Sequence, residues 1–173
     1  MLQRPCPECG IDVREVARAD IGEMVRANAV AWIAVLESPA PVRERPSPSV
    51  WSPLEYACHV RDVFRLFDHR LHLMLTEDDP LYPNWDQDAT AEAERYGEQD
   101  PGVVGLELHA AATALADDFD RVPTAAWNRT GRRSDGATFT VESFARYLIH
   151  DPVHHLHDVR HAGQGSPTLT QQG

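Results

Sequence analysis

Apolar residues recur three and four positions apart in four stretches of the chain, which is the spacing of one face of an α-helix. The first stretch covers about residues 13–36. The second begins at Ser52, which with Glu55 forms a capping box and precedes a proline suited to the first helical position. From there apolar side chains form a narrow seam as far as Met74, which is typical of a helix that packs in a bundle.

Two further helices are predicted in the second half of the chain. Asp100 and Pro101 provide a cap and a first helical residue for a helix that ends near residue 119. Thr140 caps a last helix that continues to about residue 160. Proline, glycine and acidic residues make residues 77–101 and 123–139 connecting loops. The pattern predicts an all-α fold, a four-helix bundle.

Length and composition suit a single globular domain, because 173 residues with 42% hydrophobic residues can bury one core. We expect three parts: a Cys-x2-Cys segment over residues 1–12, the helical bundle over residues 13–162, and a tail over residues 163–173. The tail is rich in Gln, Ser, Thr, Gly and Pro, a composition typical of disorder.

Charge and hydropathy restrict the partners. The formal net charge of −11 argues against nucleic acid, because binding a phosphate backbone requires a basic surface. There is no apolar run of ~18 residues and no signal-peptide core, so we expect a cytoplasmic protein without a membrane partner. All basic residues are arginine, which excludes lysine-based catalysis. The expected partner is a small-molecule substrate. The apolar seams of the helices can also pack against a second copy of the chain, so a homodimer is an alternative.

Three histidines predict a metal site. His150 and His154 are four residues apart in the last helix and therefore share one face, and His59 in the second helix can complete the set. Neutral imidazoles are common ligands of zinc and other divalent cations, and three protein ligands leave a fourth position open. Asp62 and Asp158 are spaced to accept the other ring N–H of His59 and His154.

Two alternatives remain for the histidines and cysteines. His150, His154, His157 and His161 share one helical face, which can also be a histidine-rich core or interface stripe. Cys6 and Cys9 in the run CPECG resemble half of a zinc ribbon, and with His157 and His161 they can form a second, Cys2His2 metal site. An unbound pair or a redox couple is the alternative role of these two cysteines.

The segment WSPLEYACHVRDV at residues 51–63, together with HDPVHHLHDV at residues 150–159, resembles the DinB superfamily. This resemblance implies a four-helix bundle with up-down-down-up connectivity. It also implies a metal ion, often zinc or nickel, bound by the residues that match the family's ligands: His59, His150 and His154.

The resemblance also suggests an activity. Members of the family include S-transferases that use glutathione, mycothiol or bacillithiol, and a mycothiol-dependent maleylpyruvate isomerase. A coordinating cation lowers the pKa of a thiol and so favours the thiolate nucleophile. We therefore expect metal-dependent transfer of a mycothiol-type thiol to a small electrophile, with metal-dependent hydrolysis as the next choice. The competing hypothesis is a metal-binding stress-response or interaction module without catalysis, which a site closed by a fourth protein ligand would favour.

Overall fold

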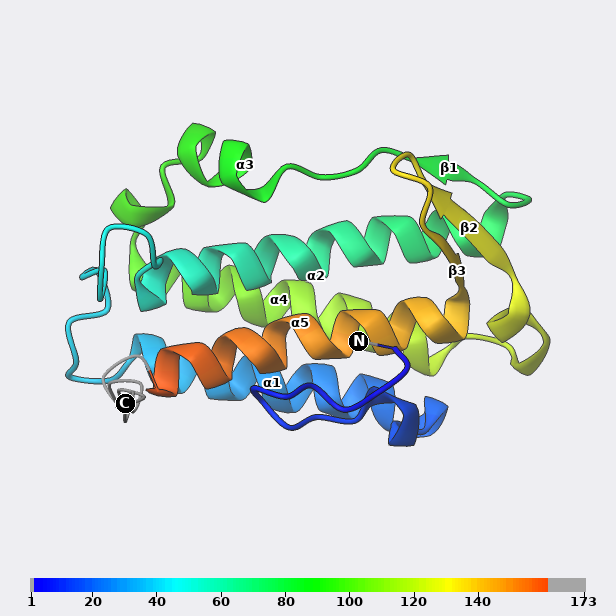
Figure 1. Ribbon diagram of the computed structural model, residues 1–173, viewed down its shortest axis with the longest axis horizontal. Coiled ribbons are helices and arrows are strands. Elements are labelled where there is room, and N and C mark those ends of the chain that lie inside the picture. The colour runs from blue at the N-terminus through cyan, green and yellow to red at the C-terminus, as the bar shows by residue number, and fades with distance from the viewer. Residues whose placement is uncertain (1, 162–173) are drawn as a thin grey trace, which may run out of the picture.

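Four long helices run side by side in the computed structural model, which describes residues 2–161 (Figure 1). Helices α1 and α5 run in one direction and α2 and α4 in the other, which is the up-down-down-up connectivity that the resemblance implies. Helix α4 packs closely against both α1 and α2, and α5 contacts the same two helices. The four helices are Ile21–Leu36 (α1), Pro53–Thr76 (α2), Pro101–Asp120 (α4) and Val141–His161 (α5).

The predicted starts of α2 and α4 are confirmed, together with the hydrogen bonds that produce them. The hydroxyl of Ser52 accepts from the backbone N–H of Glu55 at 3.3 Å, and the Glu55 carboxylate accepts from the N–H of Ser52 at 2.8 Å. Asp100 caps α4 by accepting from the N–H of Val103 at 3.0 Å. These contacts satisfy amide groups that a helix leaves without partners in its first turn.

The core lies between the helices and uses the seam predicted for α2. All members of that seam are buried: Ala57, Val60, Phe64, Phe67, Leu71 and Met74. The rings of Phe67 and Phe144 stack with centroids 4.4 Å apart, which joins α2 to α5. Residues with this spacing pack at a helix interface and make the largest contribution to the stability of such a bundle.

The predicted first helix is wrong at its beginning. Regular helix starts at Ile21, and the preceding residues form two 3-10 turns, Val13–Glu15 and Arg18–Asp20. Val16 between them has an extended backbone, with φ −70° and ψ 116°, which interrupts the helix. Val13 and Val16 are nevertheless buried. Short turns have therefore placed these apolar residues in the core, so their spacing alone was not evidence of a continuous helix.

The expected all-α class also needs correction, because a small sheet covers one end of the bundle (Figure 1). Strand β1 (Leu81–Tyr82) pairs in parallel with β2 (Thr130–Arg133), and β2 pairs antiparallel with β3 (Thr138–Thr140). Gly136, with φ +95°, makes the turn between β2 and β3. The predicted loop before α4 also contains a short helix, α3 (Gln87–Ala93), and a 3-10 turn, Tyr96–Glu98.

The tail predicted for residues 163–173 lies outside the described residues. Within residues 2–161, no helix is both long enough and apolar enough to cross a lipid bilayer.

Candidate metal centre

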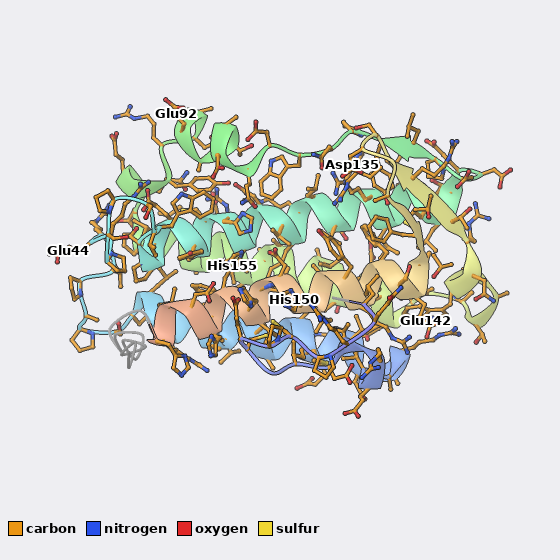
Figure 2. All side chains as sticks on the ribbon, viewed as in Figure 1. Glu44, Glu92, Asp135, Glu142, His150 and His155 are labelled. Carbon is orange, nitrogen blue, oxygen red and sulfur yellow. The ribbon has the colours of Figure 1, made fainter. Side chains whose placement is uncertain are left out.

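Helix α5 carries two pairs of potential metal ligands on adjoining faces. Asp151 and His155 are four residues apart, and so are His150 and His154. Each pair shares one face, but adjacent residues differ by about 100° around a helix, so the two pairs point in different directions. Figure 2 labels one residue of each pair, His150 and His155. The structure gives each pair its own partners.

The first group joins α5 to α2 and consists of His59, Asp151 and His155, with ligand atoms that all lie within 4.8 Å of one another. His59 Nε2 lies 3.2 Å from Asp151 Oδ2, and His155 Nε2 lies 3.7 Å from Asp151 Oδ1. Ligands held at ~2.1 Å by one ion are about 3–4 Å apart. The three side chains are therefore close to the separation that a shared cation requires.

The surroundings orient these ligands. His155 Nδ1 lies 3.3 Å from Asp158 Oδ2, and a hydrogen bond there leaves the lone pair of Nε2 directed toward Asp151. Trp85 stacks on the His59 ring with centroids 5.3 Å apart and an interplanar angle of 5°. His59 is only 1% exposed, and its Nδ1 has no hydrogen-bond partner within residues 2–161.

The ionisation states suit metal binding. Burial opposes ionisation of Asp151, but the hydrogen bond from His59 and the nearby His155 outweigh it and lower the pKa of this carboxyl. Burial also lowers the pKa of His155, with a further contribution from His59, and so favours its neutral form. A carboxylate and neutral imidazoles are the forms that coordinate cations.

The second group joins α5 to the N-terminal segment and consists of Cys6, Cys9, His150 and His154, again with ligand atoms within 4.8 Å of one another. Cys6 Sγ lies 3.6 Å from His154 Nδ1. The other nitrogen of that ring, Nε2, lies 3.2 Å from Glu8 Oε2 and 3.6 Å from Asp158 Oδ2. His154 therefore lies between a sulfur and two carboxylates.

The two thiols of this group differ in acidity. A hydrogen bond with His150, followed by the backbone N–H of Cys9 and that of Glu8, lowers the pKa of Cys6 to about 6. Burial raises the pKa of Cys9, and the neighbouring Cys6 adds to this. Cys58, on α2, belongs to neither group, and burial raises the pKa of its thiol to about 12, consistent with the structural thiol expected from the sequence.

The structure groups the predicted ligands differently from the sequence expectation. Among residues 2–161, His59 does not form a ligand group with His150 and His154. Cys6 and Cys9 meet that histidine pair instead of the expected His157 and His161. The latter two stack on each other with ring centroids 4.0 Å apart, and His161 Nδ1 bonds the backbone oxygen of His157 at 2.8 Å.

The residues that the sequence interpretation missed are Asp151 and His155. Their spacing, Asp-x3-His, equals that of His150 and His154, and both pairs occur in the same run, HDPVHH. The run therefore contained the signal. Spacing identifies residues on one helical face, but it does not say which face is turned toward α2.

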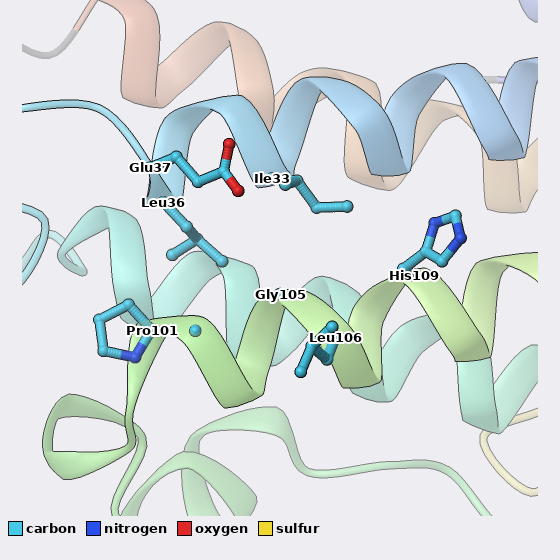
Figure 3. Close-up of a pocket in the computed structure, with 8 residues that line it drawn as sticks. Ile33, Leu36, Glu37, Pro101, Gly105, Leu106 and His109 are labelled. Carbon is cyan, nitrogen blue, oxygen red and sulfur yellow. The ribbon is translucent and has the colours of Figure 1, made fainter.

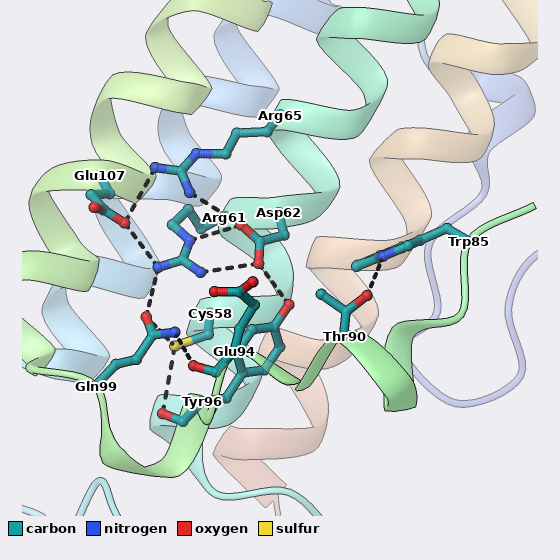
Figure 4. A network of polar contacts seen from close by, with 10 residues as sticks. All are labelled: Cys58, Arg61, Asp62, Arg65, Trp85, Thr90, Glu94, Tyr96, Gln99 and Glu107. Carbon is teal, nitrogen blue, oxygen red and sulfur yellow. Dashed lines mark hydrogen bonds and ion pairs between the residues drawn. The ribbon is translucent and has the colours of Figure 1, made fainter. Parts of the chain in front are cut away.

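Asp62, predicted to orient His59, belongs to another network (Figure 4). Its carboxylate accepts from the Arg61 guanidinium at 2.9 and 3.0 Å and from the Tyr96 hydroxyl at 2.6 Å. Burial opposes ionisation of Asp62, but the hydrogen bonds from Arg61 and Tyr96 outweigh it and lower its pKa. The network fixes the loop around Tyr96 to α2.

Replacing Asp62 by Asn is expected to destabilise the protein by about 2 kcal/mol at neutral pH, because a half-buried arginine network loses its carboxylate. Since folding lowers the Asp62 pKa, its contribution is complete above the unfolded value of about 4 and disappears as the pH falls through the folded value. Urea unfolding at several pH values measures this. The exposed Asp88→Asn control should change stability by less than about 0.5 kcal/mol, and an equal effect in both variants would contradict the assignment.

A cavity of about 250 Å³ adjoins the first group and includes His59 and Asp151 in its wall. Arg70 also lines it, although this residue is only 4% exposed. Its guanidinium donates to the backbone oxygen of Pro83 at 2.7 Å, and no carboxylate of residues 2–161 lies within ion-pair distance of it. Burial lowers the pKa of Arg70, yet an arginine remains protonated in proteins. The cavity therefore places a buried positive charge near the metal ligands.

Another cavity, of about 280 Å³, lies between α1 and α4 (Figure 3). Its wall is largely apolar and includes Ile33, Leu36 and Leu106, with Glu37 and His109 at the edge. Neither ligand group contributes to it. Both groups of potential metal ligands in the described residues therefore lie between α2, α5 and the N-terminal segment. Formation of a homodimer remains a prediction.

Comparisons with known proteins agree with this architecture. The family described as the DinB superfamily matches residues 22–159. No curated protein matches the chain. Among solved structures, YfiT from Bacillus subtilis superposes with a TM-score of 0.72 at 16% sequence identity, covering 84% of this chain and 87% of YfiT. YfiT is described as a probable metal-dependent hydrolase with an unusual four-helix bundle topology. The similarity establishes a common fold.

Proposed function

Because the chain belongs to the DinB superfamily, we propose that it is a metal-dependent enzyme in which His59, Asp151 and His155 hold a divalent cation. The observation that carries the proposal is the convergence of these three ligands from two helices beside a cavity. Within residues 2–161 this group offers three protein ligands rather than four, which leaves a position for a reactant. The description of YfiT as a probable metal-dependent hydrolase supports the same kind of chemistry.

The ligand set fits a cation of the first transition series. Two imidazoles and one carboxylate bind zinc in several hydrolases, and the same set binds iron(II) in other enzymes. Zinc or nickel remains our first choice. His59 is buried, and one of its ring nitrogens has no hydrogen-bond partner within residues 2–161. Asp158 orients His155, and both features suit coordination of a cation.

The cation would act as a Lewis acid and lower the pKa of a thiol or water beside it. The chain's own residues would prepare the reaction. Asp151 supplies negative charge, and Asp158 keeps the His155 ring in the tautomer that presents Nε2. Trp85 covers the face of His59 and limits the access of bulk water.

We propose that the substrate is a small molecule with an anionic group. Arg70 lines the same cavity as His59 and Asp151, and it has no ion-pair partner in the described part of the chain. Burying an unpaired cation is costly, and a carboxylate or a similar anion of the substrate would compensate it. Arg133 lines the same cavity but already pairs with Asp135 at 2.9 Å.

The preferred reaction is transfer of a low-molecular-weight thiol, of the mycothiol type, to a small electrophile. Hydrolysis is the second candidate, and the description of YfiT favours it. Both reactions need the same site, because each requires a nucleophile activated next to a bound electrophile. They differ only in whether a thiol or a water attacks.

One experiment separates these reactions from a role without catalysis. Protein purified without a histidine tag is stripped with a chelator, reloaded with zinc, nickel or iron(II), and incubated with an activated halonitrobenzene and a panel of thiols. Esters and amides with and without a carboxylate are tested in parallel. We expect turnover that rises at least ~100-fold on reloading. Stoichiometric metal without turnover in either assay would support the binding module instead.

A further inference from the structure

A second cluster of metal ligands lies outside the proposed active site. We propose that Cys6, Cys9, His150 and His154 bind a structural zinc ion that fastens the N-terminal segment, residues 2–12, to α5. The cluster combines two thiols and two imidazoles from parts of the chain more than 140 residues apart, with Cys6 and His154 separated by 148 positions. This is the Cys2His2 composition of closed zinc sites.

The geometry agrees with a tetrahedral ion. A sulfur at ~2.3 Å and a nitrogen at ~2.05 Å from one tetrahedral zinc lie about 3.6 Å apart. Cys6 Sγ and His154 Nδ1 are separated by 3.6 Å. All four ligand atoms lie within 4.8 Å of one another, so small side-chain rotations suffice to bring them to bonding distance. The sequence-predicted alternative with His157 and His161 has no such convergence within residues 2–161.

The turn that carries the cysteines is shaped to present two sulfurs on one side. The N–H of Cys6 donates to the oxygen of Ile11 at 2.9 Å, and the N–H of Gly10 donates to the oxygen of Cys6 at 3.0 Å. Gly10 has φ +76°, a conformation that glycine adopts without strain.

The charges and the outer contacts also fit zinc. Two thiolates neutralise a divalent cation, so the filled site has no net charge and can be half buried at little cost. Glu8 and Asp158 lie 3.2 and 3.6 Å from His154 Nε2, which is the arrangement of a carboxylate that orients a metal-binding histidine. His150 is only 6% exposed, and its Nε2 is buried with no hydrogen-bond partner in the described chain.

A bound ion would strengthen the attachment of the N-terminal segment, in which Ile11 alone packs, partly buried, against the core. None of residues 2–12 is buried, and the first buried residue of the described part of the chain is Val13. Figure 1 shows the segment, in dark blue, as an irregular loop that runs lengthwise in front of α1 and below α5 in this view. A four-ligand ion would anchor it to α5, at a face next to that of Asp151 and His155. The two metal sites thus differ in kind: this one is closed by protein, and the other is open to a reactant.

Cobalt(II) provides the direct test, because thiolate ligands give tetrahedral cobalt a strong near-ultraviolet charge-transfer band that imidazole and carboxylate ligands do not. We expect wild-type protein to bind two equivalents of cobalt and to show this band. A Cys6→Ser/Cys9→Ser variant should bind one equivalent without the band. The matched control, His157→Ala/His161→Ala, should behave as wild type.

Thiol modification supplies a second measurement that does not depend on the cobalt spectrum. In chelated protein, Cys6 and Cys9 should react readily with iodoacetamide, and zinc should slow this reaction at least ~10-fold. Cys58 is 0% exposed and should remain unmodified in both states, so it reports that the bundle is folded. Intact-mass and peptide analysis distinguishes the three cysteines.

Three results would overturn the proposal. The first is a cobalt-loaded wild type without the charge-transfer band, and the second is a Cys6→Ser/Cys9→Ser variant with undiminished metal content. The third is loss of the band in the His157→Ala/His161→Ala control. That result would make His157 and His161 the partners of Cys6 and Cys9, as the sequence analysis expected. Failure of the proposed active site is recognised separately, because a His59→Ala variant would then keep both metal content and the thiolate band.

Discussion

A His59→Ala variant is expected to lose the cation of the first group and at least ~100-fold of the metal-dependent turnover. His59 is the only ligand of that group on α2, and the remaining Asp151 and His155 both belong to α5. Loss of an outer hydrogen-bond partner of a ligand already costs about 10- to 100-fold in metal affinity or activity. Loss of a ligand itself should exceed that. Metal analysis and steady-state kinetics measure the two effects.

The control for this variant is His69→Ala. His69 lies on the same helix but is exposed, and it belongs to neither ligand group. It should retain wild-type metal content and turnover, and both variants should keep the thiolate band of cobalt-loaded protein. Unchanged turnover in His59→Ala would remove the first group from the active site and would revive the expectation that His150 and His154 serve it.

An Arg70→Met variant is expected to raise KM for an anionic substrate about 10- to 100-fold, with a much smaller change in kcat. This range corresponds to the loss of one hydrogen bond between charged groups, about 1.5–3 kcal/mol. Methionine preserves most of the volume and replaces a buried cation by an apolar group, so the fold should persist. The inhibition constant of a simple carboxylate such as benzoate gives the same information without a known substrate.

The matched control is Arg132→Met, in the sheet next to the cavity. Arg132 is exposed and pairs with Asp79 at 2.8 Å, and it does not line the cavity. It should leave KM and benzoate inhibition unchanged. Comparison of substrates with and without a carboxylate completes the test. If Arg70→Met affects charged and neutral substrates equally, the buried arginine has a structural role and the proposed substrate class is wrong.

Local rules predicted the helices well, because their starts are determined by neighbours in the sequence. Ser52 and Glu55 lie three residues apart and form the capping box in the structure. Asp100 and Pro101 begin α4 where the sequence predicts it. Such contacts depend on a single turn of chain and can be read without knowledge of the fold.

The sheet was missed because its contacts join distant parts of the chain. Leu81 in β1 pairs with Arg132 in β2, about fifty positions later. The strands contain only two to four residues, too few for an alternating pattern to be recognised. Gly131 is required because an added Cβ would lie 2.7 Å from Met74 Cγ, a contact with α2 that only the folded chain contains.

The structure groups the candidate metal ligands differently from the sequence-based prediction for a related reason. The sequence run from His150 to His155 contains two pairs with identical spacing, and only the rotation of α5 about its axis decides which pair meets His59. That rotation is set by packing along the whole helix, where Phe144 and Leu148 are buried. Side-chain chemistry pointed to α5, while tertiary packing determines which of its faces meets His59.

The placement of both ligand pairs within six consecutive residues of α5 has a consequence for how this protein tolerates change in length. Insertions and deletions in the loops alter the loop conformation locally, and the bundle can absorb them. Adding one residue between Asp151 and His154 would turn every later side chain by about a hundred degrees, separating the members of each pair at once. This short run should therefore accept no change in length, even though the loops elsewhere can vary.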